Sequence, residues 1–71
     1  IQSSMSRAQY FMEVAKKQGM LGDKREERIN YRQAMLAYEK AGVFSYAQNV
    51  AQILGDKEME QVYHDIIRYV K

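Results

Sequence analysis

The sequence contains no cysteine and no proline, and it has a single histidine. Without cysteine no disulfide framework is available, and one histidine does not make a common zinc site. No apolar run approaches the roughly 20 residues that span a bilayer, and no signal-peptide pattern opens the chain. These absences favour an intracellular, cytoplasmic protein, and they leave the stability of the 71-residue chain to its apolar core.

Several kinds of functional site are missing from the pattern as well. There is no glycine-rich phosphate loop, no paired carboxylates and no metal-ligand cluster, so we expect no catalytic residues, no cofactor and no metal site. His64 lies between Tyr63 and Asp65 and is interpreted as a surface residue. Eleven basic residues against nine acidic ones give a net charge of +2, which is weaker than the clustered basic surface of a nucleic-acid-binding protein.

The chain begins at Ile1 rather than at a methionine. The sequence is therefore either a piece of a longer protein or a chain whose native start is Met5, after vector-derived residues. In both cases residues 1–71 are interpreted as one all-helical domain, because a chain of this length forms one domain at most.

The abundant residues predict helices. Ala, Gln, Glu, Lys, Met and Arg dominate, and no stretch alternates between apolar and polar residues as a strand does. Glycine ends helices by adopting the left-handed conformation, so Gly22, Gly42 and Gly55 mark boundaries, while Gly19 lies in a last turn or ends its helix early. The predicted helices cover residues 4–20, 24–41, 44–54 and 57–70.

Two of these helices carry capping residues. Ser4 or Ser6 is predicted to cap the first helix, and Asp23 the second, where Glu26 would complete a capping box. Short connections make sequential helices antiparallel neighbours. The expected fold is all-α: three to four antiparallel helices arranged as helical hairpins in a bundle.

Apolar residues at helical spacing predict the buried side of each helix. The predicted inward residues are Met5, Ala8, Phe11, Met12 and Ala15, then Tyr31, Ala34, Met35, Tyr38 and Ala41, then Phe44, Ala47, Val50, Ala51 and Leu54, and finally Met59, Val62, Tyr63, Ile66, Ile67 and Val70. All five methionines, Met20 included, are interpreted as core residues. Tyr10, Tyr46 and Tyr69 lie off these stripes.

A short repeat divides the chain. Leu21-Gly22-Asp23-Lys24 recurs 33 residues later as Leu54-Gly55-Asp56-Lys57. Each copy follows a helix that contains Val-Ala and precedes a charged turn and an apolar side with a tyrosine. A period of roughly 34 residues is typical of helix-turn-helix solenoids.

Residues 30–54 resemble a tetratricopeptide repeat. Tyr31 and Tyr38 fall at two aromatic positions of the family, Gly42 at its turn, and Ala47 at the small residue where the two helices approach closely. The sequence departs from the family pattern at Met35, Ala51 and Leu54, no proline closes the repeat, and Gly55 ends its second helix early. The resemblance implies stacked helical hairpins. Another superhelical arrangement, or a compact three- or four-helix bundle, also fits the sequence.

The resemblance also implies that a partner binds along the first helix of each hairpin. Arg28 and Arg32 are spaced to hold a carboxylate or phosphate bidentately. Leu36 stands where the family's clamp for acidic chaperone tails has an asparagine, so that clamp is not expected. Tyr46 is a rigid aromatic candidate outside the core. The predicted partner-binding residues are Arg25, Arg28, Arg32, Gln33, Leu36, Tyr46 and Arg68.

The predicted function is a non-catalytic protein–protein interaction module of adaptor or scaffold type. Its partner would be another protein or peptide, and self-association through the terminal helices is a further option. One alternative is a small basic helical domain that binds nucleic acid. That alternative would use Lys16, Lys17, Lys24, Arg25, Arg28 and Arg32. The other is a structural unit of a larger protein with no ligand of its own.

Overall fold

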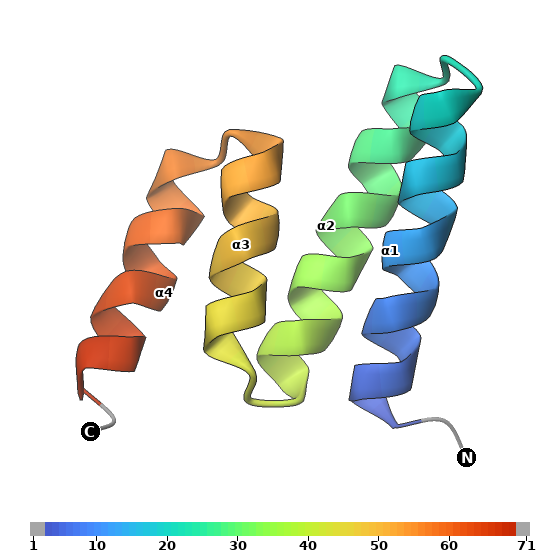
Figure 1. Cartoon of the computed structure of the whole chain (residues 1–71). Coiled ribbons are helices and arrows are strands. Elements are labelled where there is room, and N and C mark those ends of the chain that lie inside the picture. Colours follow the sequence, from blue (N-terminus) through green and yellow to red (C-terminus); the bar gives the residue numbers. More distant parts are fainter. Residues whose placement is uncertain (1–2, 70–71) are drawn as a thin grey trace.

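Four helices stand side by side in one row (Figure 1). The structure is a computed structural model that describes residues 3–69. The helices are α1 (Ser4–Met20), α2 (Lys24–Lys40), α3 (Phe44–Leu54) and α4 (Lys57–Tyr69). Each runs antiparallel to the one before it, and no residue from 3 to 69 is in a strand. The predicted all-α bundle of antiparallel helices is confirmed. Val70, which was predicted to face inward at the end of the fourth helix, lies outside the described residues.

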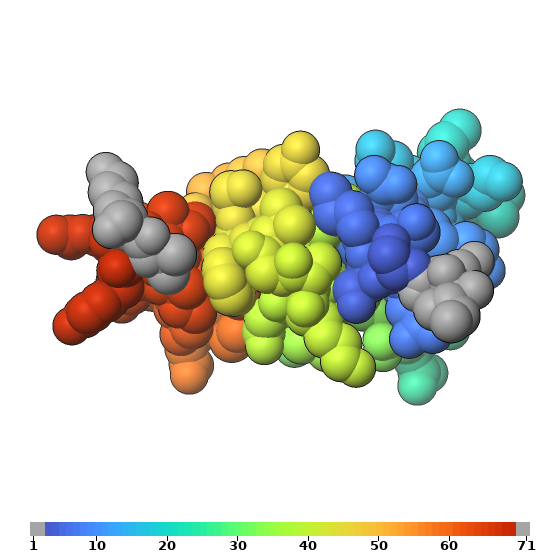
Figure 2. All heavy atoms as spheres, turned by 90° about the horizontal axis from the view of Figure 1, so that it is seen from below, coloured from blue at the N-terminus to red at the C-terminus, as the bar shows by residue number. Residues whose placement is uncertain are grey.

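Each helix packs against its neighbours in the sequence. α1 packs against α2, α2 against α3, and α3 against α4. The Cα atoms span 40 × 32 × 12 Å, so the molecule is a single layer of helices. Figure 2 shows this row from below, with α1 at one end and α4 at the other. The inner helices α2 and α3 therefore have neighbours on two sides, whereas α1 and α4 have one neighbour each.

The three turns between helices share one backbone geometry. Gly22, Gly42 and Gly55 have φ angles of 81, 77 and 70°. In each turn the glycine N–H donates to the carbonyl three residues earlier, and the next N–H donates to the carbonyl five residues before it. This is the Schellman motif, which requires the left-handed conformation that glycine adopts without steric penalty. The three predicted helix ends are confirmed, and Gly19 lies inside α1.

Two aspartates begin the helices that follow the repeated tetrapeptide. Asp23 Oδ1 accepts the N–H of Glu26 at 3.2 Å, and Asp56 Oδ1 accepts the N–H of Met59 at 3.1 Å. The prediction that Asp23 caps α2 is confirmed. The reciprocal half of the capping box is not formed, because the N–H of Asp23 donates to the carbonyl of Gln18.

The predicted cap of α1 was wrong by at least one position. Ser3 is the N-cap, and its Oγ accepts the N–H of Ser6 at 3.2 Å. Ser4 and Ser6 already lie within the helix. Three serines in four positions leave the sequence ambiguous, because each has the side chain that a cap needs.

The core follows the predicted stripes closely. Its buried residues are Ala8, Ala15, Tyr31, Ala34, Met35, Ala37, Tyr38, Ala47, Val50, Ala51, Leu54 and Tyr63. Six of these twelve are alanines, so the helices approach closely around a thin core. Tyr31, Tyr38 and Tyr63 are confirmed as core residues, whereas Tyr10, Tyr46 and Tyr69 are exposed.

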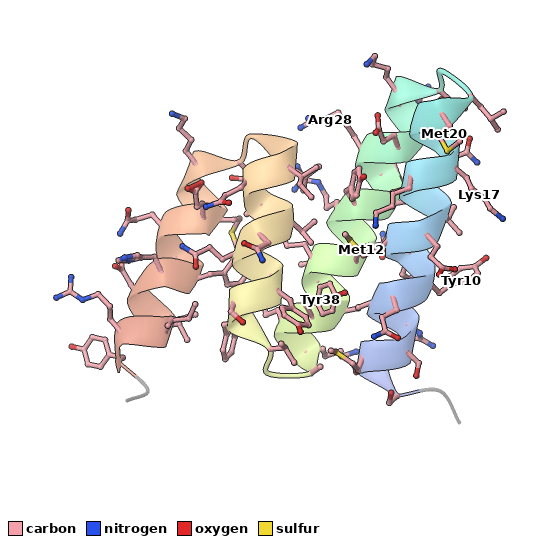
Figure 3. All side chains as sticks on the ribbon, viewed as in Figure 1. Tyr10, Met12, Lys17, Met20, Arg28 and Tyr38 are labelled. Carbon is pink, nitrogen blue, oxygen red and sulfur yellow. The ribbon has the colours of Figure 1, made fainter. Side chains whose placement is uncertain are left out.

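Three predicted inward residues are exposed instead. Ala41 is exposed because α2 ends at Lys40, which leaves Ala41 in the turn. Val62 is 41% exposed because α4 packs against α3 alone, and one edge of its apolar stripe has no cover. Met20 is 88% exposed at the last residue of α1, where no neighbouring helix covers it (Figure 3).

Candidate partner-binding surface

α2 turns its buried residues toward the core and leaves a continuous strip uncovered on its other side. Arg25, Ile29, Arg32 and Leu36 recur at intervals of four, three and four residues, and all are exposed. This spacing places them on one side of a helix. We call the surface formed by Arg25, Arg28, Ile29, Arg32, Gln33 and Leu36 the open face of α2.

The centre of the open face is a shallow depression of about 320 Å³. It is lined by Arg25, Arg28, Ile29, Arg32 and Gln33. All of these residues belong to α2, so the depression has no opposite wall. It is therefore a surface hollow and not an enclosed cavity of the kind that surrounds a small molecule.

A second depression of about 280 Å³ continues the first along the boundary between α1 and α2. Gln33 lines both hollows, which makes them one strip. The second is lined by Ser4, Arg7, Phe11, Gln33, Leu36, Ala37 and Lys40. Between them, the two depressions include five of the chain's eleven basic residues and no acidic residue. The strip is therefore positive.

Two aliphatic side chains interrupt the positive charge. Ile29 is 43% exposed and Leu36 is 46% exposed, although both lie on a helix with a well-buried opposite side. They are seven residues apart, which corresponds to roughly 10.5 Å along the helix axis. Exposed aliphatic residues among cations form a mixed surface that can bury apolar area and pair charges at the same time.

Arg28 has a structural role at the edge of this strip. Its Nη1 donates to the carbonyl of Leu54 at 3.0 Å, which joins α2 to the end of α3. Figure 3 shows the side chain extending from α2 toward α3. Arg28 also lines a separate hollow of about 230 Å³ with Lys24, Glu27, Tyr31, Ile53 and Leu54. Because Arg28 Nη1 already donates to Leu54, Arg28 has fewer donors than Arg32 available for a bidentate contact with a ligand.

A second hydrogen bond joins α2 to α4. The hydroxyl of Tyr63 donates to Glu39 Oε1 at 2.6 Å, although these helices are not adjacent in the row. Burial raises the pKa of the Tyr63 hydroxyl well above its ordinary range, and the hydrogen bond to Glu39 raises this pKa further. Glu39 therefore directs its carboxylate toward α4, and it does not line the depressions of the open face.

Two of the seven predicted partner-binding residues lie elsewhere. Tyr46 of α3 packs edge-on against Tyr38, with ring centroids 5.3 Å apart, and is 47% exposed. Arg68 of α4 lines a hollow of about 430 Å³ with Asp65 and Tyr69. The structure brings the remaining five together: Arg25, Arg28, Arg32, Gln33 and Leu36.

Two basic residues of the strip were not predicted from the sequence. Lys40 follows Leu36 by four residues, so helical spacing alone could have placed it on the open face. Arg7 belongs to α1, and its place beside Leu36 depends on how α1 packs against α2. No spacing within one helix carries that information.

The residues proposed for nucleic-acid binding do not gather on one surface. Lys17 points away from α2 on the outer side of α1, whereas Arg28 extends from α2 toward α3 (Figure 3). Lys16 and Lys17 are absent from the lining of both depressions on the open face. Arg25, Arg28 and Arg32 of α2 line the central depression together, and the two lysines of α1 lie apart from it.

No protein-family model matches this chain, and neither a curated protein nor a solved structure does. Within residues 3–69, no helix is long and apolar enough to cross a membrane. The same residues contain no group of three or more His, Cys, Asp or Glu side chains that could hold a metal ion. His64 is exposed on α4. The open face of α2 is therefore the candidate site of this chain.

Proposed function

We propose that this chain is a non-catalytic protein–protein interaction module of adaptor or scaffold type. It acts in the cytoplasm as a divergent repeat of the tetratricopeptide kind, and it binds another protein through the open face of α2. The observation that carries the proposal is a positive strip, open to solvent, in which Ile29 and Leu36 are exposed between cations.

A macromolecular partner fits this strip better than a small molecule. The central depression is lined by α2 alone, so a small ligand would keep its outer side in water. A partner surface supplies the missing wall and buries the aliphatic residues. Burial of apolar area is the main favourable contribution to most protein association.

A protein partner also fits better than a nucleic acid. The cations of the strip surround Ile29 and Leu36, whose burial against a sugar–phosphate backbone would gain little. Nucleic-acid binding gains its affinity from many phosphate contacts along a basic surface. Here Lys17 points away from the α2 cations, which shortens any such surface.

Selection from a random peptide library displayed on phage tests the proposal. The immobilised chain should enrich peptides that bind the wild type and lose binding to an Ile29→Asp/Leu36→Asp variant. The matched control is Tyr10→Asp/Ile53→Asp, which adds the same two charges at residues that are 60% and 55% exposed outside the strip. The control should keep binding. Enriched peptides that bind all three proteins equally would contradict the proposal, as would a failure to enrich any peptide.

A further inference from the structure

We infer that the partner of the open face is an acidic amphipathic helix. It is a segment of another protein that has two apolar residues seven positions apart and Asp or Glu beside each of them. This inference rests on the proposed function and specifies the chemistry of the partner at the same surface.

The charge of the strip selects an acidic partner. Arg7, Arg25, Arg28, Arg32 and Lys40 line the two depressions, and no carboxylate does. The chain as a whole has a net charge of only +2, so the basic residues are concentrated here beyond the average. Glu39, a nearby carboxylate on α2, accepts the hydroxyl of Tyr63. Complementary potentials accelerate the encounter and discriminate against basic segments.

The apolar pair sets the spacing of the partner. Ile29 and Leu36 are separated by roughly two helical turns, or about 10.5 Å. Two apolar residues seven positions apart on a partner helix have the same separation. The partner's apolar side chains can then meet Ile29 and Leu36 together, while its flanking carboxylates reach Arg25, Arg32 and Lys40.

The absence of a sheet edge in residues 3–69 favours a helical partner over an extended one. Residues 3–69 contain no strand, so an extended peptide would find no sheet edge with which to pair its N–H and C=O groups. Those groups would lose water on the side that meets the protein, which is unfavourable without replacement hydrogen bonds. A helix satisfies its own backbone and presents only side chains.

A designed peptide tests the inference by fluorescence anisotropy. The probe is a labelled peptide of about 16 residues, or roughly 24 Å as a helix. It has leucine at two positions seven apart, glutamate on both sides of each leucine and alanine elsewhere. It should bind the wild-type chain. Three comparison peptides replace every glutamate by glutamine, both leucines by alanine, or the central residue by proline, and each should bind at least about tenfold more weakly.

Charge-reversal variants locate the binding. Arg25→Glu/Arg32→Glu should weaken binding of the probe at least about tenfold. Lys16→Glu/Lys17→Glu makes the same change in net charge on α1 and should stay within about twofold of the wild type. Arg28 is left intact because it holds the carbonyl of Leu54. Circular dichroism shows that both variants are folded before they are compared.

Each other outcome overturns a definite part of the argument. Equal binding of the glutamine peptide removes the acidic partner, and equal binding of the proline peptide removes the helix. An equal loss in both charge-reversal variants means that binding follows net charge and not the open face. In these cases phage-selected peptides that depend on Ile29 and Leu36 would still uphold the proposed function. Tighter binding of a single-stranded oligonucleotide than of any peptide, lost in Arg25→Glu/Arg32→Glu, would overturn both.

Discussion

The same four residues, Leu-Gly-Asp-Lys, follow one another at the ends of α1 and α3, yet the two leucines have opposite environments. Leu21 is 79% exposed, whereas Leu54 is 5% exposed. The backbone turns are alike, because Gly22 and Gly55 both have positive φ and make the same pair of hydrogen bonds with their neighbours. The difference between the leucines therefore does not come from the turn.

The difference comes from what packs against the helix that each copy ends. α3 has an earlier helix beside it, and α1 does not. α3 is preceded by α2, and the side chains of Lys24, Glu27, Arg28 and Tyr31 border the hollow that contains Leu54. α1 is the first helix of residues 3–69, and no corresponding helix lies over Leu21. The tetrapeptide thus forms the same turn in both places. Its leucine belongs to the core only in the second copy, where a preceding helix covers it.

The replacement of Leu54 by alanine should have the largest effect on the free energy of unfolding. Removal of a buried leucine loses its apolar contacts and leaves a cavity, so Leu54→Ala should lower the free energy of unfolding by about 2–4 kcal/mol. Leu21→Ala removes a side chain that is already in water and should change it by less than about 0.5 kcal/mol. Urea unfolding followed by circular dichroism measures both values.

A conservative variant keeps this comparison measurable if Leu54→Ala does not fold. Leu54→Met conserves volume and should cost less than about 1.5 kcal/mol. Similar losses for Leu21→Ala and Leu54→Ala would show that Leu21 is covered in solution by something that contacts α1. The difference between the two copies would then disappear.

The tyrosines that follow the two copies provide the second comparison. Tyr63 is fully buried, and its hydroxyl donates to the carboxylate of Glu39. Tyr31 is 8% exposed and borders the hollow beside Leu54. A hydrogen bond to a charged group contributes about 1.5–3 kcal/mol, so Tyr63→Phe should cost about that much. Tyr31→Phe should cost less than Tyr63→Phe, because within residues 3–69 the Tyr31 hydroxyl makes no hydrogen bond to a charged group and is not buried without a partner.

The pH dependence of stability tests the same bond. The folded state raises the pKa of Tyr63 above its ordinary value of 10.0, and burial also raises the pKa of Tyr38. Above about pH 10 the unfolded chain loses these protons while the folded chain keeps them, so stability falls as pH rises. A tyrosine that ionises in the unfolded chain but stays protonated in the folded chain, as Tyr63 does, contributes about 1.4 kcal/mol per pH unit.

Tyr63→Phe should therefore have a shallower alkaline slope than the wild type. The measurement is urea unfolding between about pH 9 and 11, with the variant compared to the wild type at each pH. An unchanged slope in Tyr63→Phe would mean that its hydroxyl ionises as easily in the folded chain as in the unfolded one.

Local features of the fold could be predicted from the sequence, because they depend on residues close in the chain. The positive φ of Gly22, Gly42 and Gly55 and the cap at Asp23 follow from short-range rules, and so do the bounds of the helices to within a residue. The spacing of Arg25, Arg32 and Leu36 also places them on one side of α2 without knowledge of the packing.

The remaining features depend on which helices become neighbours. Leu21 and Leu54 have the same local sequence and different burial. Val62 belongs to the apolar stripe of α4, yet it is exposed because only α3 packs against that helix. Arg7 joins the strip only through the contact between α1 and α2. Helical periodicity shows which side chains share one side of a helix. It does not show which other helix, if any, packs against that side.

The glycines offer the smallest effects and the sharpest check that the two turns are equivalent. A methyl group added at Gly22 or Gly55 meets no atom within 4 Å, so only the left-handed backbone opposes it. Gly22→Ala and Gly55→Ala should each cost about 1–2 kcal/mol, and the two values should agree.

Gly19→Ala is the control in the same stretch of chain. It lies within α1, where alanine is favoured over glycine by about 1 kcal/mol, and only the flexible carboxylate end of Glu27 has to move. It should therefore stabilise the chain. If thermal unfolding shows that Gly55→Ala costs clearly more than Gly22→Ala, the turns differ in the packing they carry as well as in the leucines beside them.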